Sequence, residues 1–192
     1  EVASSRMEQY DSTSRKPSEV KSASLKEDLK RRDFTINAMA MDIHPENFGE
    51  IMDPLGGVAD LEKKILRTPL DPDKTFSDDP LRMMRAAYFA SKLNFKIEPQ
   101  CRISIIKQAN RIKIVSWERI RGEFLKILAT AKPSIGLVIL QKTGLMKIGA
   151  TGCPGNDAER ECANQDCLIV GDGLSLVEHV EHDEVWNKIE GP

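Results

Sequence analysis

The chain has 192 residues, of which 40% are hydrophobic and 30% charged, a composition typical of a soluble globular domain with or without an appendage. The longest apolar runs are too short to cross a bilayer, and no basic leader with an apolar core opens the sequence. These features exclude a transmembrane protein, and we expect a cytoplasmic one.

The net charge of −2 conceals a segregation along the chain. Residues 82–132 hold 12 Lys and Arg against 3 Asp and Glu, a net charge of +9. Residues 148–192 hold 2 against 10, a net charge of −8. The basic stretch favours a polyanion as partner, because each neutralised phosphate releases counterions. A solvated helical face is the alternative explanation.

The first part of the chain predicts a mixture of short strands and helices. A strand end is expected in residues 1–10, a polar loop in 11–24, and a short helix from Asp33 to Met41 with Asp33 at its start. Residues 48–57 predict a strand that enters a turn, and residues 58–64 and 65–68 predict a short helix and a short strand.

After a linker at residues 69–77, four helices joined by short turns are expected. Their predicted ranges are 77–94, 99–111, 116–130 and 133–142. Ser77 is expected to cap the first of them, with Pro80 tolerated in its first turn. The sequence therefore predicts an α+β fold with an all-helical second half. Periodicity fades from Gly149 on, with one last helix expected at 175–189.

One group of charged residues suggests that the first of these helices reads a nucleotide base. Asp79, Arg82 and Arg85 are spaced three apart, so they share one side of a helix. An aspartate acceptor beside an arginine fork matches the pairing edge of cytosine or adenine and rejects uracil and guanine. Arg85, one turn deeper, can reach a phosphate. The alternative is an exposed ion pair between residues i and i+3.

A second group lies in the segment KRRDFTINAMAMD. Arg32 can supply positive charge to a triphosphate, and Asp33 can accept a hydrogen bond from a ribose hydroxyl. Asn37 follows four residues later on the same side of the predicted helix. The alternative is a capped helix with exposed arginines. The four cysteines form no C-x-x-C motif, and their spacing favours reduced thiols over a zinc site.

Four motifs occur in order: RRDFTINAMA, DPLGGVADLEKKILRT, DDPLRMMRA and SWERIRGEFLKIL. With them the sequence resembles the class II tRNA nucleotidyltransferase and poly(A) polymerase family, which includes the CCA-adding enzymes, over about residues 1–147. The resemblance implies a partial polymerase-β-like nucleotidyltransferase head at 1–75, with a short antiparallel or mixed sheet, and a helical neck at 76–147. Residues 148–192 stay unassigned, and a truncated or frame-shifted reading of a longer gene would explain them.

The resemblance implies tRNA 3′-end CCA addition, which is nucleotidyl transfer from CTP and ATP to an RNA 3′-hydroxyl with Mg²⁺. A poly(A) polymerase relative and a catalytically inactive nucleotide- or RNA-binding fragment are the alternatives. The motifs imply that the ribose, triphosphate and base contacts are Arg32, Asp33, Asn37, Asp79, Arg82 and Arg85. The residues expected to brace the neck are Ser116, Glu118, Arg119 and Glu123. The basic residues that could follow RNA phosphates are Lys92, Lys96, Arg102, Lys107, Arg111 and Lys113.

The sequence also departs from the family pattern. Asp78 stands where the family usually has Glu, and Tyr88 stands where it usually has a further arginine. The Asp-x-Asp pair that holds two catalytic metal ions is expected upstream of residue 1, so we assign no catalytic or metal residue here. We interpret two look-alikes as structural: Asp71-Pro72-Asp73, and the Gly-Gly stretch at residues 56–62. The chain alone is therefore expected to incorporate no nucleotide.

Overall fold

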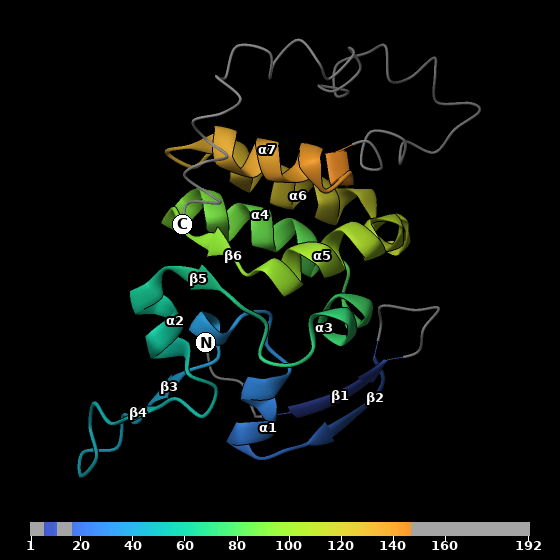
Figure 1. Ribbon diagram of the computed structural model, residues 1–192. Helices are drawn as coiled ribbons and strands as arrows, with labels where there is room; N and C mark the ends of the chain where they lie inside the picture. The colour runs from blue at the N-terminus through green and yellow to red at the C-terminus, as the bar shows by residue number, and fades with distance from the viewer. Residues whose placement is uncertain (1–5, 11–16, 147–192) are drawn as a thin grey trace.

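The computed structural model describes residues 6–10 and 17–146, with side chains described from Ala23 on. Its described part is α+β, as predicted, with three two-stranded sheets and a stack of helices. In Figure 1 the helices that follow residue 80 lie together at one end, and the short strands and helices of the first half lie at the other. The predicted last helix and the tail at 148–192 lie outside the described residues.

The first half supplies the head. Its elements in chain order are β1 (Arg6–Tyr10), β2 (Pro17–Ser22), α1 (Leu25–Lys30), the 3₁₀ turn η1 (Thr35–Asn37), β3 (Ala40–Met41), β4 (Ile51–Met52), α2 (Gly57–Lys63) and β5 (Ile65–Leu66). The strands pair antiparallel as β1 with β2 and β3 with β4. The helix expected at 58–64 is confirmed within one residue, and short strands form inside the predicted ranges 1–10, 48–57 and 65–68.

The second half supplies the helical neck. Its elements are α3 (Pro72–Asp78), α4 (Leu81–Leu93), β6 (Lys96–Ile97), α5 (Pro99–Gln108), the 3₁₀ helix η2 (Ala109–Ile114), α6 (Trp117–Leu128) and α7 (Pro133–Lys142). The helices predicted at 99–111, 116–130 and 133–142 are confirmed, the first of them ending in η2. No helix in the described ranges is long and apolar enough to cross a membrane.

The prediction of a continuous loop at residues 11–24 is wrong, because the second part of this segment forms β2 and the N-cap of α1. Strand β2 pairs with β1 in antiparallel register. Ser24 then begins α1 with a capping box, in which its hydroxyl accepts from Glu27 N and the Glu27 carboxylate accepts from Ser24 N. The sequence does contain this motif, a serine followed three residues later by a glutamate, but it lies in a serine-rich stretch that is also typical of a loop.

The helix predicted from Asp33 to Met41 is also wrong, since only one 3₁₀ turn forms before β3. Phe34 is extended, and its N–H donates to the Asp33 carboxylate. Thr35 N donates to the carbonyl of Arg67, and its hydroxyl donates to buried Asp60 at 2.7 Å. Tertiary partners thus take the groups that a helix would pair internally.

The single helix predicted at 77–94 is two helices, α3 and α4, with Asp79 between them. Asp79 is extended, with φ −141° and ψ 100°, because the following Pro80 disfavours helical geometry in the residue before it. Ser77 lies inside α3 and caps nothing; Asp79 accepts from Leu81 N at 3.2 Å instead. The expected linker at 69–77 is mostly α3, which Asp71 caps through Asp73 N.

Helix α4 is the centre of the neck and the element against which the head packs. Its buried side chains include Met83, Ala86 and Ala90, which belong to the core, and the helix packs against α6 and α7. Strand β5 of the head pairs in parallel with β6, directly after α4. The ring of Phe34 meets that of Phe89 edge to face, with centroids 5.8 Å apart. Head and neck therefore share one core.

A glycine allows the head elements to approach closely. A Cβ on Gly57 would lie 2.3 Å from the carbonyl oxygen of Thr35 and 2.9 Å from Met39 Cγ. We expect Gly57→Ala to lower the free energy of unfolding by about 1–3 kcal/mol, because the backbone must shift. Urea unfolding measures this change.

Gly122→Ala is the matched control, since it is also a helical glycine and its Cβ would meet nothing within 4 Å. That variant should be neutral or more stable by up to about 1 kcal/mol. Equal behaviour of the two variants would contradict the close approach.

Candidate nucleotide site

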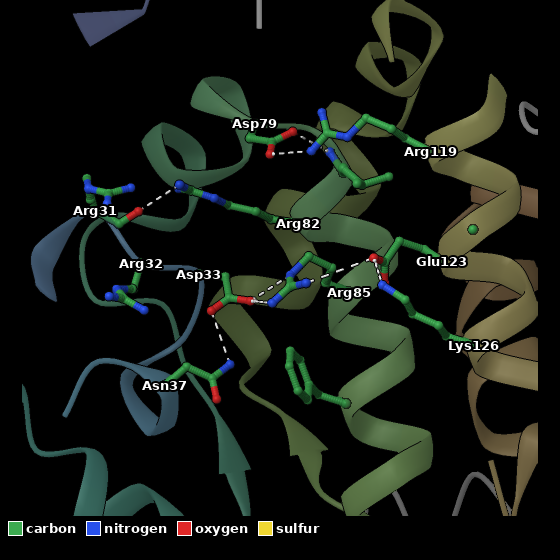
Figure 2. Close-up of a pocket in the computed structure, with 13 residues that line it drawn as sticks. Arg31, Arg32, Asp33, Asn37, Asp79, Arg82, Arg85, Arg119, Glu123 and Lys126 are labelled. Carbon is green, nitrogen blue, oxygen red and sulfur yellow. Dashed lines mark hydrogen bonds and ion pairs between the residues drawn. The ribbon is translucent and has the colours of Figure 1, made fainter. Parts of the chain in front are cut away.

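A cleft of about 750 Å³ lies between the segment after α1 and helices α4 and α6. Figure 2 shows its charged side chains facing one another across this gap. Its acidic lining residues are Asp33, Asp79 and Glu123. Its basic lining residues are Arg31, Arg32, Arg82, Arg85, Arg119 and Lys126. Within this lining, six cations against three acids favour an anionic ligand.

The strongest link across the cleft joins Asp33 to Arg85. Arg85 donates from Nε and Nη2 to Asp33 Oδ2, at 2.8 and 2.6 Å. The other carboxylate oxygen accepts from Phe34 N and from Asn37 Nδ2, at 2.9 and 3.1 Å. The guanidinium of Arg85 also lies over the ring of Phe89, 5.3 Å from its centroid. Asp33 is therefore buried and its two oxygens are held in a fixed orientation.

The two residues predicted to read the base have separate partners. Arg82 donates to two backbone carbonyls, to Arg31 O at 2.7 Å and to Thr75 O at 3.3 Å. Asp79 Oδ2 pairs with Arg119 Nη2 of α6 at 3.3 Å. The alternative of an i,i+3 ion pair between Asp79 and Arg82 is wrong, because Asp79 precedes α4 in extended backbone. Both side chains still line the cleft.

Arg32 and Asn37 complete the predicted set at the head side. Arg32 is half exposed and pairs with Asp28 Oδ2 at 3.1 Å, while the other oxygen of Asp28 binds Arg31 at 2.6 Å. Asn37 reaches Asp33 through the 3₁₀ turn η1 and not through a helix. The structure thus brings all six predicted nucleotide contacts to one cleft.

The six residues predicted for RNA do not line this cleft. Lys107 pairs with Asp73 at 2.5 Å, and Arg111 donates to the carbonyl of Ser77 at 2.9 Å, so both join α3 to the following helices. Lys92 lies over the ring of Tyr88, at 5.5 Å. Exposed on the neck are Lys92, Lys96 and Lys113, while Arg102 is half-buried on α5.

The two look-alike motifs have structural partners. Hydrogen bonds from Lys107 and Ser104 hold the pKa of Asp73 below its usual value, and the same ion pair raises the pKa of Lys107. Asp60, inside the Gly-Gly stretch, is buried under Thr35. Among the described side chains no group of three or more His, Cys, Asp or Glu could hold a metal ion. Burial raises the pKa of the Cys101 thiol to about 11, which keeps it neutral.

Sequence reasoning assigned Arg119 and Glu123 only as braces and missed Arg31, Lys126 and Phe89. Arg119, Glu123 and Lys126 occur at i, i+4 and i+7 of α6, which is the spacing of one helical face. Arg82, Arg85 and Phe89 have the same kind of spacing on α4. The spacing therefore predicts one row of side chains on each helix, but it does not predict that the two helices face each other.

Comparison with known proteins supports the fold. A family model of the poly(A) polymerase head domain matches residues 1–67, and one of the "probable RNA and SrmB-binding site of polymerase A" matches residues 94–149. The CCA-adding enzyme of Levilactobacillus brevis is 45% identical over 122 residues, 64% of this chain and 30% of that protein. The enzyme of Bacillus velezensis is 41% identical over 148 residues, 77% of this chain and 36% of that protein.

Solved structures agree with these relatives. The CCA-adding enzyme of Bacillus stearothermophilus in complex with CTP has a TM-score of 0.63 and 38% identity, covering 74% of this chain and 34% of that one. A tRNA nucleotidyltransferase with a primer tRNA and an incoming ATP analogue has a TM-score of 0.64 and 34% identity, covering 71% of this chain and 40% of that one.

The mixed head and helical neck are thus the fold of a nucleotidyltransferase. The chain belongs to the class II tRNA nucleotidyltransferase and poly(A) polymerase family, which includes the CCA-adding enzymes. It spans about a third of the length of the curated relatives given above.

The ion pair of Asp33 and Arg85 gives a direct test of the cleft. Asp33→Asn should lower the free energy of unfolding by about 2 kcal/mol. It removes a charge-assisted hydrogen bond and leaves the partly buried Arg85 without the negative charge of Asp33. Chemical denaturation measures the loss. Glu62→Gln, at an exposed acid on α2, is the control and should change stability by less than about 0.5 kcal/mol. Equal losses would mean that the pair adds nothing.

Proposed function

We propose that this chain provides the nucleotide-selecting part of an enzyme that adds CCA to the 3′ end of tRNA from CTP and ATP. The observation that carries the proposal is the cleft, in which all six predicted nucleotide contacts meet with an excess of positive charge. The relatives named above support tRNA over other acceptors, since they are CCA-adding enzymes and one solved structure holds a primer tRNA.

The base is proposed to lie against Asp79 and Arg82. Cytosine and adenine both present an amino donor beside a ring acceptor, which suits an aspartate acceptor and an arginine donor. Uracil and guanine present a ring N–H and a carbonyl instead, and would oppose donor to donor and acceptor to acceptor. Because Arg119 and Leu81 N hold the two oxygens of Asp79, this acceptor has a defined direction.

The phosphates are proposed to lie against Arg85 and Arg32, and the ribose against Asp33 and Asn37. Arg85 keeps its Nη1 group outside the bond to Asp33, so it can donate to a phosphate without losing that bond. The exposed half of Arg32 is available in the same way. The neck cations Lys92, Lys96 and Lys113 are proposed to follow RNA phosphates, through charge and not through base recognition.

Magnesium belongs to the proposal for the whole enzyme, since nucleotidyl transfer needs a metal-activated hydroxyl and a stabilised pyrophosphate. The described residues do not fit such a centre, because no cluster of suitable ligands occurs among them. No step is assigned to a metal here. A chain that binds nucleotide without transferring it is therefore the second candidate function.

Arg82→Ala tests base selection. We expect wild-type chain to bind CTP and ATP in preference to UTP and GTP, and the variant to lose about 2 kcal/mol of that preference. Isothermal titration with the four triphosphates measures the affinities. Lys113→Ala, at an exposed lysine outside the cleft, is the charge-matched control. An unchanged preference would show that Arg82 only joins head to neck through its two carbonyl partners.

Transfer is tested separately from binding. Incubated with tRNA that lacks its CCA end, labelled CTP and Mg²⁺, the 192-residue chain should bind nucleotide but incorporate no detectable CMP. The physical reason is that the described residues supply no carboxylate pair to hold a metal that would activate the attacking hydroxyl. Gel analysis of the tRNA gives the answer. Robust metal-dependent incorporation would refute the second candidate function and place the ligands outside the described residues.

A further inference from the structure

Glu123 is a buried carboxylate in the wall of the cleft, and its charge is shared by two cations. Its side chain is only 6% exposed. Oε1 accepts from Lys126 Nζ at 2.8 Å and lies 3.9 Å from Arg85 Nη1. Oε2 is buried and has no hydrogen-bond partner among the described residues. Figure 2 shows Glu123 between Arg85 of α4 and Lys126 of its own helix.

Lys126 is a cleft cation with donors left for a ligand. Its ammonium group has three donors, and the structure gives one of them to Glu123. Arg85 already uses Nε and Nη2 on Asp33, and Arg82 uses two donors on backbone carbonyls. The Lys126 side chain lines the cleft and is 54% exposed, so it can reach a ligand without a change in the surrounding backbone.

Helix α4 supplies two cations to the cleft, and Lys126 of α6 lines the same cleft. Arg82 and Arg85 are three residues apart, and three residues further on stands the uncharged Tyr88. The charge near Tyr88 is Lys92, above its ring, and neither residue lines the cleft. Helix α6 brings a cation to the same cleft next to Arg85. A polyanion along α4 would therefore meet Arg82, Arg85 and then Lys126.

We propose that Lys126 binds the triphosphate of the nucleotide and that Glu123 is a positioning residue for it. Glu123 holds the Lys126 and Arg85 cations side by side in the empty cleft and competes with the incoming phosphates for them. The Lys126 end of this i,i+3 pair is 54% exposed, so the pair contributes little to stability, and bracing alone does not account for the arrangement. The inference rests on the proposed function and adds a residue on α6 to it.

Lys126→Met tests the phosphate contact, and its exposure makes misfolding of the variant a small risk. The 192-residue chain is titrated with CTP, inorganic tripolyphosphate and cytidine. We expect about a tenfold loss of affinity for CTP and tripolyphosphate, with no change for cytidine, because only the phosphates meet the ammonium group. Lys126→Arg should restore most of the loss. Lys132→Met, an exposed lysine outside the cleft, should have no effect.

Glu123→Gln tests whether Glu123 competes with phosphate, because competition and bracing predict changes of opposite sign. If Glu123 competes with phosphate, removing its charge should raise the affinity for tripolyphosphate, by about threefold. If it only braces the helices, the affinity should fall as the cleft loosens. A fall, in a variant with the wild-type circular dichroism spectrum, overturns the competition of Glu123 with phosphate.

The controls distinguish failure of this inference from failure of the proposed function. Wild-type chain that binds neither CTP nor tripolyphosphate overturns both. Wild-type chain that binds CTP, with Lys126→Met binding it equally well, overturns the inference alone. A matching loss for cytidine would also overturn it, because the variant would then have disturbed the whole cleft and not one phosphate contact.

Discussion

The bond between Asp33 and Arg85 determines where the head lies against the neck, and the cleft depends on it. The two residues are 52 positions apart in the sequence, and a single carboxylate oxygen accepts both donors. Arg85 is placed by α4, which packs against α6 and α7 and contributes seven buried residues. Asp33 is placed by the backbone of Phe34 and by Asn37. Each partner is thus rigid before the pair forms, which reduces the entropy lost in forming it.

Two aromatic rings pack against this ion pair. Phe89, one turn after Arg85, lies under the Arg85 guanidinium and makes a T-shaped contact with Phe34, the neighbour of Asp33. Charge and apolar contact therefore cross the junction at the same place. The arrangement also excludes water from one side of the ion pair, which strengthens it relative to a fully exposed one.

The sequence allowed prediction of the elements whose signals are local. Helix α7 was predicted with its observed ends, since Pro133 begins it and its apolar pattern is regular. The errors occurred where a distant partner competed with local preference: Thr35 gives its N–H to Arg67, and so no helix forms after Asp33. Pro80 was read as a tolerated first-turn residue, although its effect on Asp79 was the stronger one. Motif order brought the six nucleotide contacts together, but their partners across the cleft could not be read from one helix at a time.

The cleft combines two requirements that oppose each other. Six cations near one another favour a triphosphate, yet in the empty protein they repel and would weaken the junction between head and neck. Asp33, Asp79 and Glu123 offset that repulsion, and each is bonded to a cation of the opposite wall or the neighbouring turn. The same acids limit how strongly the cations can attract phosphate. The acidic residues that stabilise the empty cleft therefore also determine which of its charges a ligand can reach.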